Sequence, residues 1–115
     1  MKKAVMYGAG NIGRGFIGKV FSDSGYEVCF LDIAAEIIRE INERGEYPVR
    51  IVSNEGHRDE IVKNVHAVHA GSEQAVSAIA ACEIMATAVG VNVLPRIAPV
   101  IAKGVIERMN TGRAL

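Results

Sequence analysis

The first residues that could do chemistry are three glycines near the start of the chain, Gly8, Gly10 and Gly13, which have the spacing G-x-G-x-x-G. Between a buried strand and a helix, such a loop turns bare backbone N–H groups, here near Asn11 and Ile12, toward two linked phosphates. We expect Gly8 to permit a tight turn, Gly10 to admit the phosphates and Gly13 to let helix and strand pack closely. The spacing therefore predicts a pyrophosphate site.

An acidic residue follows this loop at the distance that a dinucleotide requires. Asp32 ends the next apolar run, about 20 residues after Gly13, where a carboxylate accepts hydrogen bonds from the hydroxyls of an adenosine ribose. A 2′-phosphate there would meet a like charge, and Ile33 and Ala34 offer no arginine to compensate for it. The pattern favours NAD over NADP. Two alternatives stay open: Asp32 caps the following helix, and Arg14, which could bond the phosphates, is simply solvated.

A later apolar run supplies a second part of the predicted site. Residues 84–89 read as a buried strand that Gly90 closes. Ligands of open α/β sheets bind at the carboxyl ends of the strands, where the strand order reverses. We therefore expect Ala88 and Val89 to lie beside the cofactor.

The elements that must position these residues follow from periodicity. Apolar runs predict buried strands at 4–7, 27–32, 65–70 and 84–89. Helical spacing predicts helices from Asn11 to a stop at Ser24 and Gly25, and at 34–44, 72–81 and 92–109. Two alternating runs, 47–53 and 60–65, predict an antiparallel hairpin with its loop at 54–59. Strand, helix and strand in succession make the strands parallel, so we predict an α/β, Rossmann-type doubly wound sheet with an inserted β-hairpin.

Finer expectations concern side-chain directions and helix ends. In the first helix we expect one inward stripe, made of Ile12, Phe16, Ile17, Val20 and Phe21. In the second we expect the inward residues to be Ile33, Ile37, Ile38 and Ile41. Asn92 should cap the last helix, and Pro99 should kink that helix or delay its start.

Composition excludes several classes of function. The 115 residues carry 13 basic and 13 acidic side chains, a balance that implies neither a nucleic-acid nor a membrane-surface partner. No apolar run reaches the ~18 residues of a membrane helix. Cys29 and Cys82 lack metal spacing and are expected as buried thiols of a reducing cytoplasm. We expect neither a metal site nor catalytic residues in this sequence.

Two blocks of sequence go beyond the general fingerprint. Residues 8–18, GAGNIGRGFIG, and the later segments 87–90, 93–94 and 96–104 resemble the bacterial mannitol-1-phosphate 5-dehydrogenase family of polyol long-chain dehydrogenases. The resemblance implies a cytoplasmic, metal-independent enzyme, a monomer or weak homo-oligomer, that interconverts D-mannitol 1-phosphate and D-fructose 6-phosphate with NAD(H). It implies cofactor contacts by Gly8, Ala9, Gly10, Asn11, Ile12, Gly13, Arg14, Gly15 and Asp32.

No residue of this sequence matches the family's catalytic lysine, asparagine and histidine, which belong to a helical substrate domain. We therefore interpret residues 1–115 as an NAD-binding Rossmann domain that binds the cofactor without catalysis, the sugar phosphate being held by the absent domain. The alternative is a non-catalytic regulatory module that senses NAD(H). A methyltransferase that binds a sulfonium nucleoside fits less well, because that ligand has no pyrophosphate for Gly10.

Overall fold

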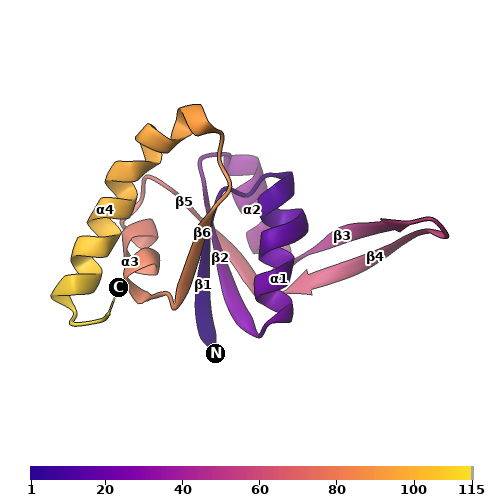
Figure 1. Cartoon of the computed structure of the whole chain (residues 1–115), viewed down its shortest axis with the longest axis horizontal. Coiled ribbons are helices and arrows are strands. Elements are labelled where there is room, and N and C mark those ends of the chain that lie inside the picture. Colours follow the sequence, from indigo (N-terminus) through magenta and orange to yellow (C-terminus); the bar gives the residue numbers. More distant parts are fainter. Residues whose placement is uncertain (115) are drawn as a thin grey trace.

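A four-stranded parallel sheet forms the centre of the molecule (Figure 1). The computed structural model describes residues 1–114. Its sheet has the strand order β5-β2-β1-β6, in which every neighbouring pair is parallel. The strands are β1 (Lys2–Tyr7), β2 (Tyr26–Asp32), β5 (Val65–His69) and β6 (Ile84–Thr87). The predicted α/β class and parallel sheet are confirmed, although β6 ends two residues earlier than expected.

Helices cover both faces of the sheet, as a doubly wound fold requires (Figure 1). One face carries a π-helical turn, η1 (Gly13–Ile17), which continues into α1 (Gly18–Asp23), together with α2 (Ala35–Arg44). The other face carries α3 (Glu73–Ala81), a short 3₁₀ turn η2 (Val91–Val93) and α4 (Leu94–Asn110). Among the described residues, no helix combines the length and the apolar character needed to cross a bilayer.

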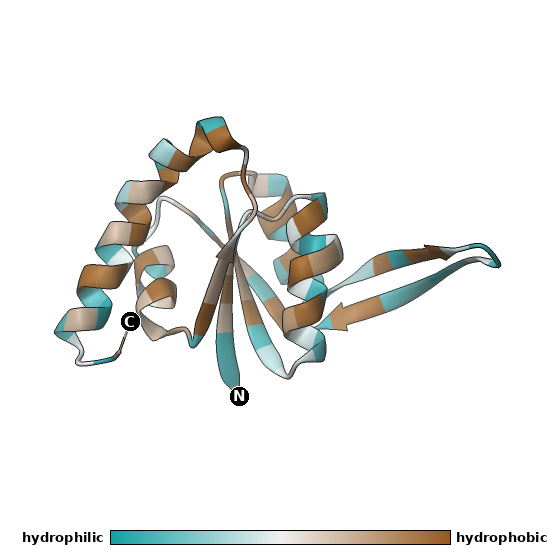
Figure 2. Ribbon diagram, viewed as in Figure 1, coloured by the Kyte–Doolittle hydropathy of each residue, from teal (hydrophilic) through white to brown (hydrophobic). Residues whose placement is uncertain are grey.

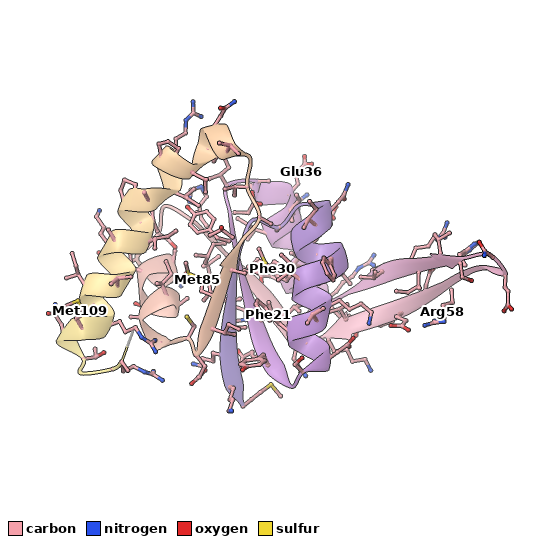
Figure 3. All side chains as sticks on the ribbon, viewed as in Figure 1. Phe21, Phe30, Glu36, Arg58, Met85 and Met109 are labelled. Atoms are coloured by element: carbon pink, nitrogen blue, oxygen red, sulfur yellow. The ribbon has the colours of Figure 1, made fainter. Side chains whose placement is uncertain are left out.

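An antiparallel hairpin projects from the α1 side of the body (Figure 1). It consists of β3 (Glu46–Ser53) and β4 (Gly56–Lys63), so the predicted insertion is confirmed. The predicted loop at 54–59 is wrong, because pairing continues to Ser53 and Gly56 and leaves Asn54 and Glu55 as the turn. Residues 57–59 are exposed, and their polar character hid the strand. Arg58 lies out on this arm (Figure 3).

Each face of the sheet has its own apolar core. Phe30 is fully buried under α1 and the hairpin, where its ring meets that of Tyr47 edge-on at 5.8 Å between centroids. Phe21 packs into the same layer, near Phe30 (Figure 3). On the opposite face, Leu31 packs among residues of α3 and α4 such as Ile79 and Ile97. Alternate residues of β2 thus enter opposite cores, which explains why its sequence is apolar throughout.

The free edge of β5 is closed by α2 rather than by another strand. The Asn42 side-chain amide donates to the Ala67 carbonyl at 2.8 Å, and its oxygen accepts from the Ala67 N–H at 2.7 Å. The Val65 N–H donates to the Gly45 carbonyl at the end of the same helix. Gly45 has φ +66°, the left-handed conformation that ends α2. Both outward-facing groups of Ala67 are therefore satisfied.

The start of α4 differs from what the sequence predicts. Asn92 does not cap this helix, because it lies within the η2 turn and Val93 holds the cap position without a side-chain bond. Pro99 does not delay the helix, which begins at Leu94 and runs past Pro99. The missing proline N–H removes a single bond, to the residue four positions earlier, while Pro95 in the first turn favours the helical φ.

The first helix also faces in an unexpected direction. Ile12, Phe16 and Val20 are 64%, 66% and 48% exposed, so the predicted inward stripe is wrong for these three residues. The buried positions are Gly13, Gly18 and Phe21, with Ile17 partly buried. Apolar colour therefore appears on the outside of this helix (Figure 2). Ile33 is likewise 75% exposed, whereas Ile41 is buried as expected.

Both cysteines are buried free thiols, as predicted. Burial raises the pKa of Cys29 to about 12, with a smaller contribution from Glu27, and burial also raises the pKa of Cys82. Because the thiolate is the reactive form, the folded chain should react with a disulfide reagent on the order of a hundredfold more slowly than the urea-unfolded chain. Stopped-flow absorbance measures both rates, and equal rates would contradict the burial of these thiols.

Candidate functional site

The loop that follows β1 turns sharply at Gly8. This residue has φ +110°, and its N–H donates to the Leu31 carbonyl at 2.8 Å. A Cβ at this position would lie 2.5 Å from the Ala88 carbonyl oxygen. Both the backbone conformation and the space require glycine here. The turn predicted for Gly8 is confirmed, and it brings the ends of β1, β2 and β6 together.

Two further glycines let the helix lie directly on the loop and the sheet. A Cβ on Gly13 would lie 2.1 Å from the Gly8 carbonyl oxygen, which confirms the predicted close packing. A Cβ on Gly18 would lie 2.6 Å from the Gly13 carbonyl oxygen and 2.7 Å from Cζ of Phe30. The Gly18 N–H donates to that Gly13 carbonyl, a bond across five residues that makes this turn a π-helix. The steric role of Gly18 was not predicted.

Gly10 differs from these packed glycines because it faces open space. Nothing lies within 4 Å of a Cβ built on Gly10, so the space beside this residue is open. The Arg14 N–H donates to the Gly10 carbonyl at 2.9 Å and closes the first helical turn. The N–H groups of this first turn have no partner within the helix, and Asn11 and Ile12 are exposed. An anion can therefore approach these donors without displacing a side chain.

The Asp32 carboxylate ties the end of β2 to this loop. One oxygen accepts from the Ala9 N–H at 2.8 Å, and the other accepts from Ile33 and Ala34 at 2.7 and 3.0 Å. Asp32 is therefore not the cap residue of α2, which is Ala34, although it bonds the backbone just before that helix. It also raises the pKa of Tyr7, second to the effect of burial. The carboxylate lies at the glycine loop, and of its roughly four lone-pair sites the one left free is on the oxygen that accepts from Ala9.

Ala88 and Val89 lie against the opposite side of the same loop. The Ala88 N–H donates to the Tyr7 carbonyl at 2.8 Å and continues the β1–β6 pairing past the end of the strand. The Ala88 carbonyl and the Val89 side chain are the atoms that would crowd a Cβ on Gly8. The structure thus brings both residues to the glycine loop, at the point where the strand order reverses.

Arg14 lines a groove that runs beside the helix. The groove has a volume of about 980 Å³ and lies between the first helical turn, the second half of α2 and the start of β3. The Arg14 Nε atom is buried there and has no hydrogen-bond partner. The Tyr47 hydroxyl donates to the Arg14 carbonyl at 2.7 Å, and burial raises the pKa of that hydroxyl. No local sequence pattern indicates this long-range contact.

Within the described residues, no group of three histidine, cysteine, aspartate or glutamate side chains is placed to hold a metal ion. The site therefore consists of backbone donors at the head of a helix, one carboxylate and a wall from the end of β6. Such a set can hold an extended phosphate-bearing molecule along the sheet edge. It contains no paired acid and base that would transfer a proton to or from a substrate.

Comparison with known proteins identifies the family to which this architecture belongs. The profile described as the mannitol dehydrogenase Rossmann domain matches residues 2–114. The chain is 46% identical over 108 residues to a mannitol-1-phosphate 5-dehydrogenase of Geobacillus thermodenitrificans and 49% identical over 108 residues to one of Shouchella clausii. These matches cover 92% of this chain but 28% and 29% of those relatives. The chain belongs to the mannitol dehydrogenase family and carries its Rossmann domain.

Proposed function

We propose that this chain binds NAD and is the cofactor-holding part of a cytoplasmic enzyme that interconverts D-mannitol 1-phosphate and D-fructose 6-phosphate. The observation that carries the proposal is the open space at Gly10, at the head of a helix in which Gly13 and Gly18 are tightly packed. The printed names of two relatives at 46% and 49% identity support the reaction. Cys29 and Cys82 are both free thiols, which supports a reducing compartment.

The residues present fit a dinucleotide. The pyrophosphate would rest on the N–H groups of the first helical turn, at Asn11 and Ile12, where the helix dipole favours negative charge. The adenosine ribose would donate to Asp32, whose carboxylate is held in place by three backbone N–H groups. The nicotinamide half would extend along Ala88 and Val89. When bound, NAD supplies the hydride acceptor, and the chain's own part is to orient it.

Asp32 also supports the choice between the two nicotinamide cofactors. Its carboxylate sits where a 2′-phosphate would bring a second negative charge, and the adjacent Ile33 carries no cation to offset it. Binding of NADP would therefore cost electrostatic energy that binding of NAD does not.

The test is calorimetric titration of the chain with NAD and with NADP. Wild type should prefer NAD, and Asp32→Ala should lose on the order of 1–3 kcal/mol of NAD affinity while the penalty against NADP shrinks. Gly10→Val should weaken the binding of both cofactors, because its Cβ enters open space and the side chain would occupy the place of the phosphates.

A matched control separates cofactor contacts from general loss of charge. Glu36→Ala removes an exposed carboxylate from the first turn of α2 and should leave both affinities unchanged. Because Asp32 also accepts three backbone bonds, circular dichroism must show that Asp32→Ala is folded at the titration temperature. An unchanged NAD preference in folded Asp32→Ala would refute the ribose role, and full affinity in Gly10→Val would refute the phosphate role.

A further inference from the structure

The outward side of the first helix carries an apolar surface that nothing in the described residues covers. Ile12, Phe16 and Val20 are spaced four residues apart and therefore share one face, on which each is about half exposed or more. We call these three residues the α1 stripe. A second exposed apolar group, Val91, Val93 and Leu94, lies at the start of α4, whereas Val52 on the hairpin is single and needs no explanation. Three large apolar side chains in a row indicate a surface that another polypeptide buries.

The Arg14 side chain, which forms no ion pair with the described residues, borders this stripe. Arg14 has its Nε buried and unbonded in the groove that Ile12 and Phe16 also line. Arg39, Arg44 and Arg50 line the same groove, as do Glu40, Glu43 and Glu46. Arg39 faces Glu43 at 4.0 Å and Arg50 faces Asp59 at 3.2 Å, so these two arginines already have partners. Arg14 and Arg44 have no ion-pair partner among the described residues, and only Arg14 lies on the helix that carries the stripe. A polypeptide that covers the stripe would therefore be complementary if it placed a carboxylate at Arg14 beside its apolar side chains.

The rest of the longer relatives is the occupant that best meets this need. More than two thirds of each of the two relatives lies outside the matched region. The stripe begins at Ile12, in the helical turn to which the proposed function assigns the phosphates. A region seated on the stripe would therefore lie next to the bound cofactor, where a substrate must be held for hydride transfer.

We propose that the α1 stripe and Arg14 form the docking surface for that region, which brings apolar side chains for Ile12, Phe16 and Val20 and a carboxylate for Arg14. The proposal rests on the proposed function, because it uses the cofactor position to choose the occupant. It also explains the mismatch between helix and core: the stripe is apolar because it is an interface, not because it faces the sheet.

A chimera tests the proposal by thiol footprinting. This chain replaces the matched region of the Geobacillus thermodenitrificans relative, and Phe16→Cys is introduced both there and in the 115-residue chain. Maleimide should label Cys at position 16 at least about tenfold more slowly in the chimera than in the short chain, because the surface is covered. Val52→Cys, far out on the hairpin, should react equally in both. The buried Cys29 and Cys82 keep the background low.

The outcomes separate the inference from the proposed function. Equal labelling at position 16 in both proteins would overturn the docking surface, even if the chimera oxidises mannitol 1-phosphate with NAD. Slower labelling in a chimera without turnover would support the surface and count against the proposed reaction. Protection that rises with the concentration of the short chain would assign the stripe to a second copy and overturn the proposal. If Phe16→Cys does not fold, Val20→Cys on the same stripe gives the same comparison.

Discussion

Gly13→Ala is expected to destabilise the chain by roughly 3 kcal/mol and to lower its melting temperature on the order of 10 °C. The added methyl would lie 2.1 Å from the Gly8 carbonyl oxygen, and Met6 stands behind that contact at 3.4 Å. A backbone oxygen cannot rotate aside as a side chain can, so the helix must move off the loop. Thermal and urea unfolding, followed by circular dichroism, measure the loss.

Gly15→Ala is the matched control for this change. It adds the same methyl two residues later in the same π-helical turn, where nothing lies within 4 Å. Replacement of glycine by alanine in a helix with free space stabilises it by up to about 1 kcal/mol. Gly15→Ala should therefore unfold at the wild-type temperature or slightly above it. Equal stability of the two variants would show that the helix and the loop are not in close contact.

Asn42→Ala should destabilise the chain by roughly 2–3 kcal/mol, because it leaves the Ala67 N–H and carbonyl without partners in a partly buried place. Besides this loss of overall stability, the hydrogen bonding of β5 near Ala67 should be weakened locally. Hydrogen exchange at the Ala67 amide should become much faster, while the amide of Val28, bonded to the Asn64 carbonyl on the other side of β5, should change less.

Glu43→Ala controls for the loss of a side chain from the same helix. Glu43 is exposed and faces Arg39 at 4.0 Å, an interaction that contributes only a few tenths of a kcal/mol. Its removal should leave both stability and exchange at Ala67 close to wild type. If Asn42→Ala behaves like Glu43→Ala, water replaces the amide at the strand edge and the side chain is dispensable.

The parallel sheet was predictable because its strands are buried on both faces. In β2, Val28 and Phe30 enter one core while Cys29 and Leu31 enter the other, so every position must be apolar. Such a run has no alternative placement in a domain of this size. The steric roles of Gly8 and Gly13 were predictable for a similar reason, since the spacing allows one strand–turn–helix geometry.

The direction of the first helix was not predictable from periodicity. An apolar stripe shows that a face avoids water, but it does not say whether the sheet or another polypeptide covers that face. The π-helical turn adds to the error, because a five-residue repeat places Gly13 and Gly18 on one side, where the ordinary 3.6-residue repeat does not. Glycine carries no hydrophobic signal, and the inward side therefore went unrecognised.

Contacts between residues far apart in the chain were not predictable from the local sequence either. Tyr47 was expected at the start of an alternating strand, and nothing near it indicates that its hydroxyl reaches Arg14. The polar strand residues around Arg58 lack alternation because both faces of the hairpin arm meet water there. In both cases the structure is determined by its tertiary surroundings, which a local sequence pattern cannot predict.

The amide of Asn42 has a consequence for how copies of this sheet can meet. Unpaired strand borders let folded proteins stick to one another and grow into fibres, which needs two open borders on each molecule. Here α2 seals the border at β5, and within residues 1–114 only the far side of β6 remains open in the four-stranded sheet. Edge-to-edge joining of the four-stranded sheets of two copies therefore stops at a symmetric pair, and a high protein concentration cannot extend that pair into a filament.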